Sequence, residues 1–167
     1  MVANNAGGEK AIKYGKVENF INELNVVFSD GNEYTVKPLT KSELESKISE
    51  NTFEGNIYKK IYELITSHFD EIESAKPDVS KNSAGYYLWN VYNNTNGNFD
   101  LCRLIVGSQG TLCIVTKINF RLVPTDKYSN LLAVFMPDIK RLSNVVTEIV
   151  PFKPDSLETY DDYSMKL

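Results

Sequence analysis

The pattern of apolar and polar positions first predicts a β-hairpin near the start of the chain. Two apolar runs, 24–28 and 33–36, lie on either side of the sequence SDGN at 29–32. Asp-Gly is a favoured pair in tight hairpin turns because glycine adopts a positive φ without strain. The two runs should therefore pair as antiparallel strands.

Two helices follow in the pattern. Thr40 and Glu43 have the spacing of a capping box, which predicts a short helix that ends before Asn51. Pro77 ends a longer helix, which we expect to pack on the sheet. Its apolar positions recur at three- and four-residue steps, at Ile57, Ile61, Leu64, Ile65, Phe69 and Ile72.

The next segment, 76–99, mixes prolines, glycines, asparagines and aromatic residues without a period, which predicts a loop. Asp100 can cap a short helix over 101–105. That helix leads to the turn GSQG at 107–110, and a strand that ends at Pro124 follows it. On this strand we expect a core face of alternating apolar residues, namely Ile114, Ile118, Phe120 and Leu122.

The last part of the chain predicts a strand–helix–strand unit. The apolar run LLAVFM at 131–136 predicts a buried strand, and SLETY at 156–160 predicts a second one. Pro137-Asp138 predicts the start of the helix between them, with an apolar side formed by Ile139, Leu142, Val146 and Ile149. The fold class is therefore α+β, with an antiparallel-rich sheet flanked by helices over 1–125 and the start of a second α+β unit over 126–167.

Composition and charge exclude several function classes. The chain has 167 residues, of which 42% are hydrophobic, so it can fill a core. Its net charge of −4 argues against a nucleic-acid partner. No apolar run approaches the roughly 20 residues of a membrane helix, and the N-terminus lacks signal-peptide features. The predicted location is the cytoplasm, and Cys102 and Cys113 suit a reducing compartment.

Most candidate chemical groups have simpler structural explanations. The single histidine, His68, lies along the apolar stripe of the long helix, which favours a packed or rim position over catalysis. The acidic residues are scattered, so we expect no metal site. Aromatic residues of the loop could stack on a ligand ring, but they more often pin such a loop to the core; they are Tyr86, Tyr87, Trp89 and Tyr92.

Two glycine-bearing segments are the remaining candidates. NNAGGEKAIKYG, at 4–15, presents a Gly-Gly pair after two asparagines, and GSQG carries Gly107 and Gly110. Such backbone can approach an anion or a planar ring closely because glycine has no Cβ. A turn without a ligand explains either segment alone equally well.

Together, in this order and separation, the segments resemble a known family. VANNAGGEKAIKYGKVENFINELNVVFSDG, followed at a distance by FDLCRLIVGSQGTLCIVTKINFRLVP, is similar to the second half of a flavin-binding domain. The domain is that of FAD-linked oxidases related to vanillyl-alcohol oxidase (the PCMH type). Within them it resembles the group of the glycolate oxidase D subunit, D-lactate dehydrogenase and D-2-hydroxyglutarate dehydrogenase. The match covers 1–37 and 99–124, and 126–167 resembles the start of that group's substrate cap domain.

The resemblance implies that both segments line an FAD cleft. By matching position, the cofactor-binding residues are Asn4, Asn5, Ala6, Gly7, Gly8, Tyr14, Gly15, Gly110, Thr111, Leu112, Cys113 and Ile114. Two positions depart from the family, which usually has glutamate where this chain has Gln109 and glycine where it has Cys113. Gln109 loses a charge, and Cys113 adds a side chain where close approach is expected.

The resemblance also implies that catalysis depends on residues outside this chain. The family's pyrophosphate-binding loop and its metal-binding and catalytic histidines have no counterpart here, so we assign no catalytic or metal residue. We expect part of an FAD-dependent 2-hydroxy-acid dehydrogenase or oxidase of the D-lactate or glycolate type, with an external electron acceptor and possible self-association. The alternatives are a noncatalytic interaction module or remnant on the same scaffold, and a nucleotide-binding domain for another ligand.

Overall fold

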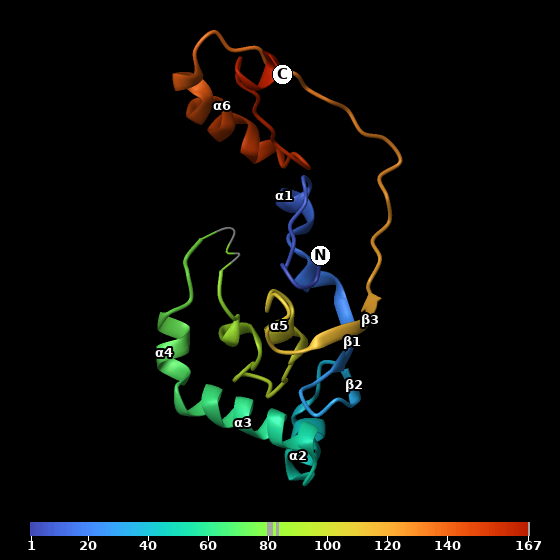
Figure 1. Ribbon diagram of the computed structural model, residues 1–167. Helices are drawn as coiled ribbons and strands as arrows, with labels where there is room; N and C mark the ends of the chain where they lie inside the picture. The colour runs from blue at the N-terminus through green and yellow to red at the C-terminus, as the bar shows by residue number, and fades with distance from the viewer. Residues whose placement is uncertain (80–81, 83, 167) are drawn as a thin grey trace. The chain divides into compact units, whose positions relative to one another are not determined.

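The computed structural model describes residues 1–79, 82 and 84–166 (Figure 1). Residues 80, 81 and 83 of the predicted loop and residue 167 of the predicted cap segment lie outside the described residues. The described chain divides into two compact units. The first unit joins Met1–Ala6 to Val17–Arg121, and the second joins Gly7–Lys16 to the residues from Leu122 onward. The predicted domain boundary at 125/126 stays a prediction.

The first unit contains a three-stranded antiparallel sheet, which confirms the α+β class. Its order is β2-β1-β3, with β1 at Ile21–Val27, β2 at Glu33–Val36 and β3 at Ile114–Phe120. The hairpin prediction is confirmed, because β1 and β2 pair in register around the 29–32 turn, where Gly31 has a φ of +80°. β1 is the central strand and carries much of the buried apolar surface.

The capping box forms as predicted at the start of α2, Lys41–Ser49. The Glu43 backbone N–H donates to Thr40 Oγ1 (3.4 Å), and the Thr40 backbone N–H donates to Glu43 Oε2 (2.8 Å). Each contact satisfies a backbone donor that the first helical turn leaves without an intrahelical acceptor.

The predicted single long helix is wrong in one respect. The structure has two helices, α3 at Phe53–Ser67 and α4 at Phe69–Ser74, with His68 between them at a φ of −122°. The His68 side chain is exposed and its Nδ1 lies 3.0 Å from Glu71 Oε2, so it is not packed in an apolar stripe.

Most of the expected apolar stripe packs on the core: Ile65 is 1% exposed, and Ile57, Ile61 and Ile72 are partly buried against it. The prediction is wrong at Leu64, which is 44% exposed. The observed face passes through Tyr58, whose ring packs against Phe99 with a centroid distance of 5.7 Å.

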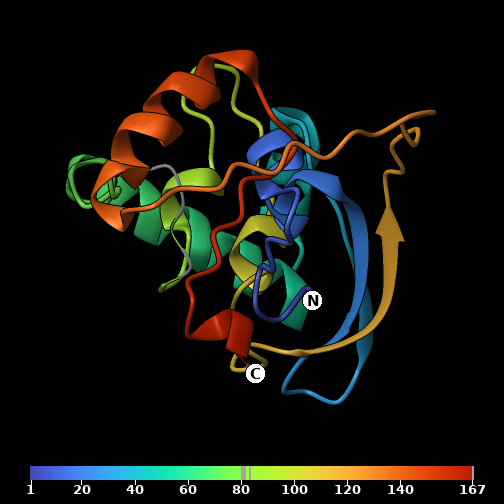
Figure 2. The ribbon, with the colours of Figure 1, turned by 90° about the horizontal axis from the view of Figure 1, so that it is seen from above.

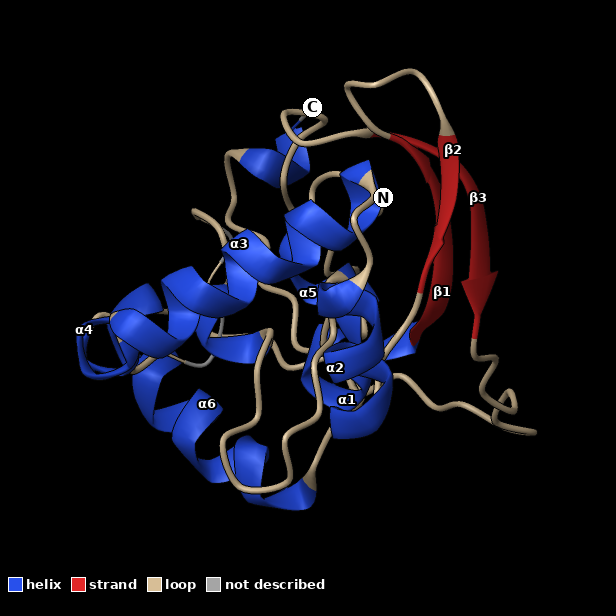
Figure 3. Ribbon diagram, turned by 90° about the horizontal axis from the view of Figure 1, so that it is seen from below, coloured by secondary structure: helices blue, strands red, loops and turns tan. Residues whose placement is uncertain are grey.

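The segment before β3 follows the prediction closely. The described residues of 76–99 are mostly irregular and include a 3-10 turn, η2 at Leu88–Asn90. A short helix, α5 at Cys102–Ile105, begins where Asp100 Oδ1 accepts the Cys102 backbone N–H (3.1 Å). Figure 3 shows α3 and α5 on the same side of the sheet, and the buried side chains of α5 form part of the core beneath β1.

The expected core face of β3 is wrong. Ile114 is 69% exposed, and Ile118, Phe120 and Leu122 are exposed too. Alternation along the strand turns Cys113 and Val115 toward the core, so Ile114 between them must face away. Further along β3, register shifts place Ile118 opposite the buried Leu24 and Phe120 opposite the buried Ile21, so both side chains lie on the core side but remain 37% and 36% exposed.

The second unit keeps the predicted helix but lacks the predicted strands. Its elements are α1 (Ala11–Tyr14), η3 (Ile139–Arg141), α6 (Leu142–Ile149), η4 (Val150–Phe152) and η5 (Ser164–Lys166). Asp138 Oδ1 accepts the Lys140 backbone N–H (3.0 Å) where the helical segment begins. Segments 131–136 and 156–160 are irregular, and no described residue pairs with either of them as a strand. A strand gains its hydrogen bonds only from a neighbour, so apolar character alone does not form one.

Candidate functional site

The turn at 107–110 requires glycine for its backbone conformation. Gly107, Gln109 and Gly110 have φ values of +87°, +54° and +77°. L-residues adopt this left-handed region only with strain, whereas glycine does so freely. The two glycines are therefore explained first by the tightness of the turn between α5 and β3.

The N-terminal segment packs directly on this turn, as Figure 2 shows near the N-terminus and α5. The Gly107 N–H donates to the Val2 carbonyl oxygen (3.0 Å), and the Gln109 N–H donates to the Ala3 carbonyl oxygen (2.8 Å). A Cβ on Gly107 would lie 3.3 Å from Asn5 Cβ, which is tighter than ordinary packing. The structure thus brings together parts of the two segments that the sequence singled out.

Asn5 also holds the N-terminal segment in place, through side-chain hydrogen bonds to Glu18. Its side chain is buried, with the residue 3% exposed, and its φ is +45°. Its Nδ2 donates to Glu18 Oε2 (2.9 Å), while its Oδ1 accepts the Glu18 backbone N–H (3.1 Å). Sequence reasoning missed Glu18, because its separation of 13 residues from Asn5 matches no local motif.

We predict that Asn5→Ala lowers the free energy of unfolding by about 2 kcal/mol, through lost hydrogen bonds and alanine at a positive φ. Asn5→Gly should cost about 1 kcal/mol less, since glycine relieves the backbone strain but not the lost bonds. Urea denaturation of both variants measures the difference. Equal stability of Asn5→Ala and the parent chain would contradict a stabilising role for the Asn5 hydrogen bonds.

The outer side of the turn is open. No heavy atom lies within 4 Å of the position that a Cβ on Gly110 would take. Among the described residues, no acceptor receives a hydrogen bond from the N–H of Gly110 or Leu112, and both residues are exposed. Thr111 Oγ1 lies 2.6 Å from the Ser108 carbonyl oxygen and 2.7 Å from the Tyr86 hydroxyl. Exposed backbone donors beside a residue without a Cβ fit the oxygens and ring nitrogens of a nucleotide cofactor.

Cys113 does not obstruct that open side. Its side chain is buried in the core, and burial raises the pKa of its thiol to about 11. Because the thiol is on the inner side of the strand, the extra side chain relative to the family's glycine leaves the outer side free. Ile114 faces outward, and Leu112 lines an apolar pocket of about 230 Å³ with residues of α3 and α5.

The other predicted cofactor residues, Gly7, Gly8, Tyr14 and Gly15, belong to the second unit. Gly15 ends α1 with a φ of +73°, and the space beside Gly8 is open. Their cofactor contacts, like those of all the other predicted cofactor residues, stay predictions.

An ion-pair cluster holds α1 within the second unit. Lys13 Nζ lies 2.6 Å from Asp126 Oδ2 and 2.9 Å from Asp155 Oδ1. These contacts raise the pKa of Lys13, and the Lys13 ammonium lowers the pKa of Asp126. The Tyr14 hydroxyl also lies 3.4 Å from Asp126 Oδ2.

Metal-binding residues do not gather in the described part of the chain. None of its side chains form a group of three or more His, Cys, Asp or Glu that could hold an ion. A second pocket of the first unit, about 460 Å³, contains none of the predicted cofactor residues.

Comparison with known proteins shows which proteins the chain is similar to. No protein-family model matches the chain. Across all 167 residues it is 26% identical to D-2-hydroxyglutarate dehydrogenase of Escherichia coli and 25% identical to that of Pseudomonas putida, and covers 16% of each. It is also 28% identical over 149 residues, 89% of its length, to D-lactate dehydrogenase of Archaeoglobus fulgidus, of which it covers 22%.

These similarities confirm the resemblance inferred from the sequence. The relatives carry the names of two enzymes in the group that the glycine segments indicated. The chain spans between 13% and 22% of the length of the curated relatives it matches, so it corresponds to one part of such proteins.

Proposed function

We propose that the chain forms part of an FAD-dependent dehydrogenase that oxidises a D-2-hydroxy acid. The observation that carries the proposal is the similarity along the whole chain to D-2-hydroxyglutarate dehydrogenases. Because the chain spans a small share of those relatives, the activity is proposed for the complete protein.

In this proposal the 107–112 turn supplies backbone contacts to the cofactor. The N–H groups of Gly110 and Leu112 can donate to a ligand, because no described residue accepts a hydrogen bond from them. Asn5 and Glu18 act indirectly, since they hold the segment on which the turn rests. When bound, FAD would accept a hydride from the carbon that bears the substrate hydroxyl. We assign no acid, base or metal ligand to this chain.

The partners and location follow from the same proposal. A small hydroxy acid is the substrate and an external acceptor takes the electrons. None of the helices in the described residues could cross a membrane, and the cytoplasmic location stays a prediction. Self-association stays one too, supported by the exposed apolar side chains of β3, Ile114 among them.

The cofactor part of the proposal can be tested by NMR with isotopically labelled chain and FAD. We expect weak, rapidly exchanging binding that shifts the amide signals of Gly110 and Leu112 first, and no stoichiometric flavin after desalting. Gly110→Ala should weaken binding about tenfold, through a Cβ and strain at a positive φ. Gly31→Ala is the matched control, since Gly31 also has a positive φ and open space.

FAD shifts that avoid 107–114, or equal effects of the two glycine variants, would contradict the proposed contact. The substrate part is tested in the complete protein by dye reduction with D-2-hydroxyglutarate and D-lactate. The L-enantiomers are the controls, and equal rates with both enantiomers would contradict a D-2-hydroxy-acid dehydrogenase.

A further inference from the structure

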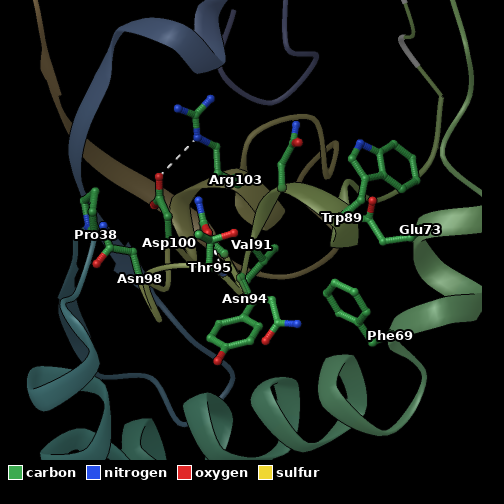
Figure 4. Close-up of a pocket in the computed structure, with 13 residues that line it drawn as sticks. Pro38, Phe69, Glu73, Trp89, Val91, Asn94, Thr95, Asn98, Asp100 and Arg103 are labelled. Carbon is green, nitrogen blue, oxygen red and sulfur yellow. Dashed lines mark hydrogen bonds and ion pairs between the residues drawn. The ribbon is translucent and has the colours of Figure 1, made fainter.

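The first unit also contains a pocket that the proposed function does not use. It has a volume of about 460 Å³ and is bounded by α4, by η2 and by the turns between η2 and α5. In Figure 4, Phe69, Trp89 and Glu73 lie together at one side of it, and Asp100 and Arg103 lie at the other. One side therefore carries two aromatic rings and a carboxylate, and the other carries a carboxylate and a guanidinium group.

The first side carries two aromatic rings. Phe69 and Trp89 are half-buried, so part of each ring packs against the protein and part of it is accessible to a ligand. The Trp89 ring stacks on Tyr87 with a centroid distance of 5.3 Å and an interplanar angle of 26°, which leaves its orientation well defined. The face of such a ring carries negative electrostatic potential and attracts a cation.

The charges that line the pocket sum to a negative value. Glu73 is exposed, and its carboxylate has no hydrogen bond or ion pair with another described residue. Asp100 Oδ2 lies 3.2 Å from Arg103 Nε, so these two charges offset each other. Burial raises the pKa of Asp100, while the Arg103 guanidinium lowers it. Arg103 is the only basic residue among those that line the pocket in the described chain.

We propose that this pocket binds a small organic cation, with the ammonium group of the ligand held between the Glu73 carboxylate and the rings of Phe69 and Trp89. The amide and hydroxyl groups of Asn94, Thr95 and Asn98, which also line the pocket, contact the polar remainder of the ligand. A ligand of the opposite sign meets an unpaired carboxylate and two aromatic faces, both of which repel it.

Trp89 provides a direct measurement, because it is the only tryptophan of the chain. The probe is choline chloride, titrated into the complete chain at constant ionic strength while tryptophan fluorescence is followed. The matched probe is 3,3-dimethyl-1-butanol, which has the shape of choline without its charge. We expect a saturable fluorescence change with choline and affinity for the neutral alcohol at least about tenfold weaker, the effect of roughly 1.4 kcal/mol of charge-dependent attraction.

Substitutions then test which groups hold the cation. Glu73→Gln should weaken choline binding at least about fivefold, and Phe69→Leu should weaken it too, with circular dichroism confirming that both variants fold. Glu63→Gln is the control, since Glu63 is an exposed glutamate of α3 outside the pocket, and it should bind choline like the parent chain.

Three results would overturn the proposal. One is the absence of any saturable choline response, and another is equal affinity for choline and its neutral isostere. The third is glucose binding that perturbs Trp89 and survives Glu73→Gln, which would identify a sugar site that uses the amides and the indole. None of these outcomes depends on FAD binding or on dehydrogenase activity.

Discussion

Ile65→Ala is expected to lower the free energy of unfolding by about 2–5 kcal/mol, the usual range for a large aliphatic residue truncated in a core. Ile65 is 1% exposed and belongs to the core cluster that also contains Tyr58 and Phe99. Its removal would leave a cavity that the backbone of α3 cannot close without losing its contact with Phe99.

Leu64→Ala is the matched control for that variant. The two residues are adjacent in the same helix, but Leu64 is 44% exposed and keeps much of its surface in water. Its truncation should cost about 1 kcal/mol or less. Urea denaturation of the pair gives the comparison directly. Similar losses for the two variants, or a larger loss for Leu64→Ala, would mean that α3 is rotated relative to the structure.

Elements with a complete local signal could be predicted from the sequence. The hairpin at 29–32, the capping box of Thr40 and Glu43, and the start of α5 at Asp100 each depend on residues within a few positions of one another. The positive φ values of Gly107 and Gly110 have the same local origin, since a four-residue turn fixes its own backbone.

Features decided by tertiary packing could not be predicted in this way. The apolar alternation of β3 predicts that Ile114 faces the core, yet the core takes Cys113 and Val115, and a register shift then brings Ile118 opposite the buried Leu24. Which side of a strand is buried depends on where the helices lie, and no period-2 pattern contains that information. Segment 131–136 has the composition of a strand but no paired neighbour among the described residues, so composition predicted a structure that pairing does not support.

The candidate site, too, could be predicted only in part. The sequence identified the two glycine-bearing segments, and the structure packs Val2 and Ala3 against the 107–110 turn. The contact of Asn5 with Glu18 was not predicted, because a side-chain pair across 13 residues leaves no pattern in the sequence. Likewise, the resemblance to the flavin-binding domain indicated that the Cys113 side chain hinders close approach, and only its burial shows that the thiol lies on the inner side of the strand.

Gly55→Ala is the second substitution for which we expect a large change in the free energy of unfolding. Helix propensity alone predicts the wrong sign for this change. In an ordinary helix interior, replacing glycine with alanine stabilises by about 1 kcal/mol. Gly55 lies in the first turn of α3, where its N–H donates to Thr52 Oγ1 (3.0 Å) and its Cα faces the end of α2. A Cβ at this position would lie 2.5 Å from the Glu50 carbonyl oxygen and 2.8 Å from the Lys47 carbonyl oxygen.

We therefore expect Gly55→Ala to destabilise the chain by about 3 kcal/mol, at the upper end of the usual range for overpacking. Both contacts are with backbone oxygens, which cannot rotate away as a flexible side chain would, so relief requires α2 and α3 to separate. Asn56→Ala is the control, because Asn56 is exposed in the same helical turn and should gain a few tenths of a kcal/mol from propensity. Urea denaturation of both variants decides the sign, and a Gly55→Ala chain more stable than its parent would show that α2 and α3 do not approach each other as closely as the structure indicates.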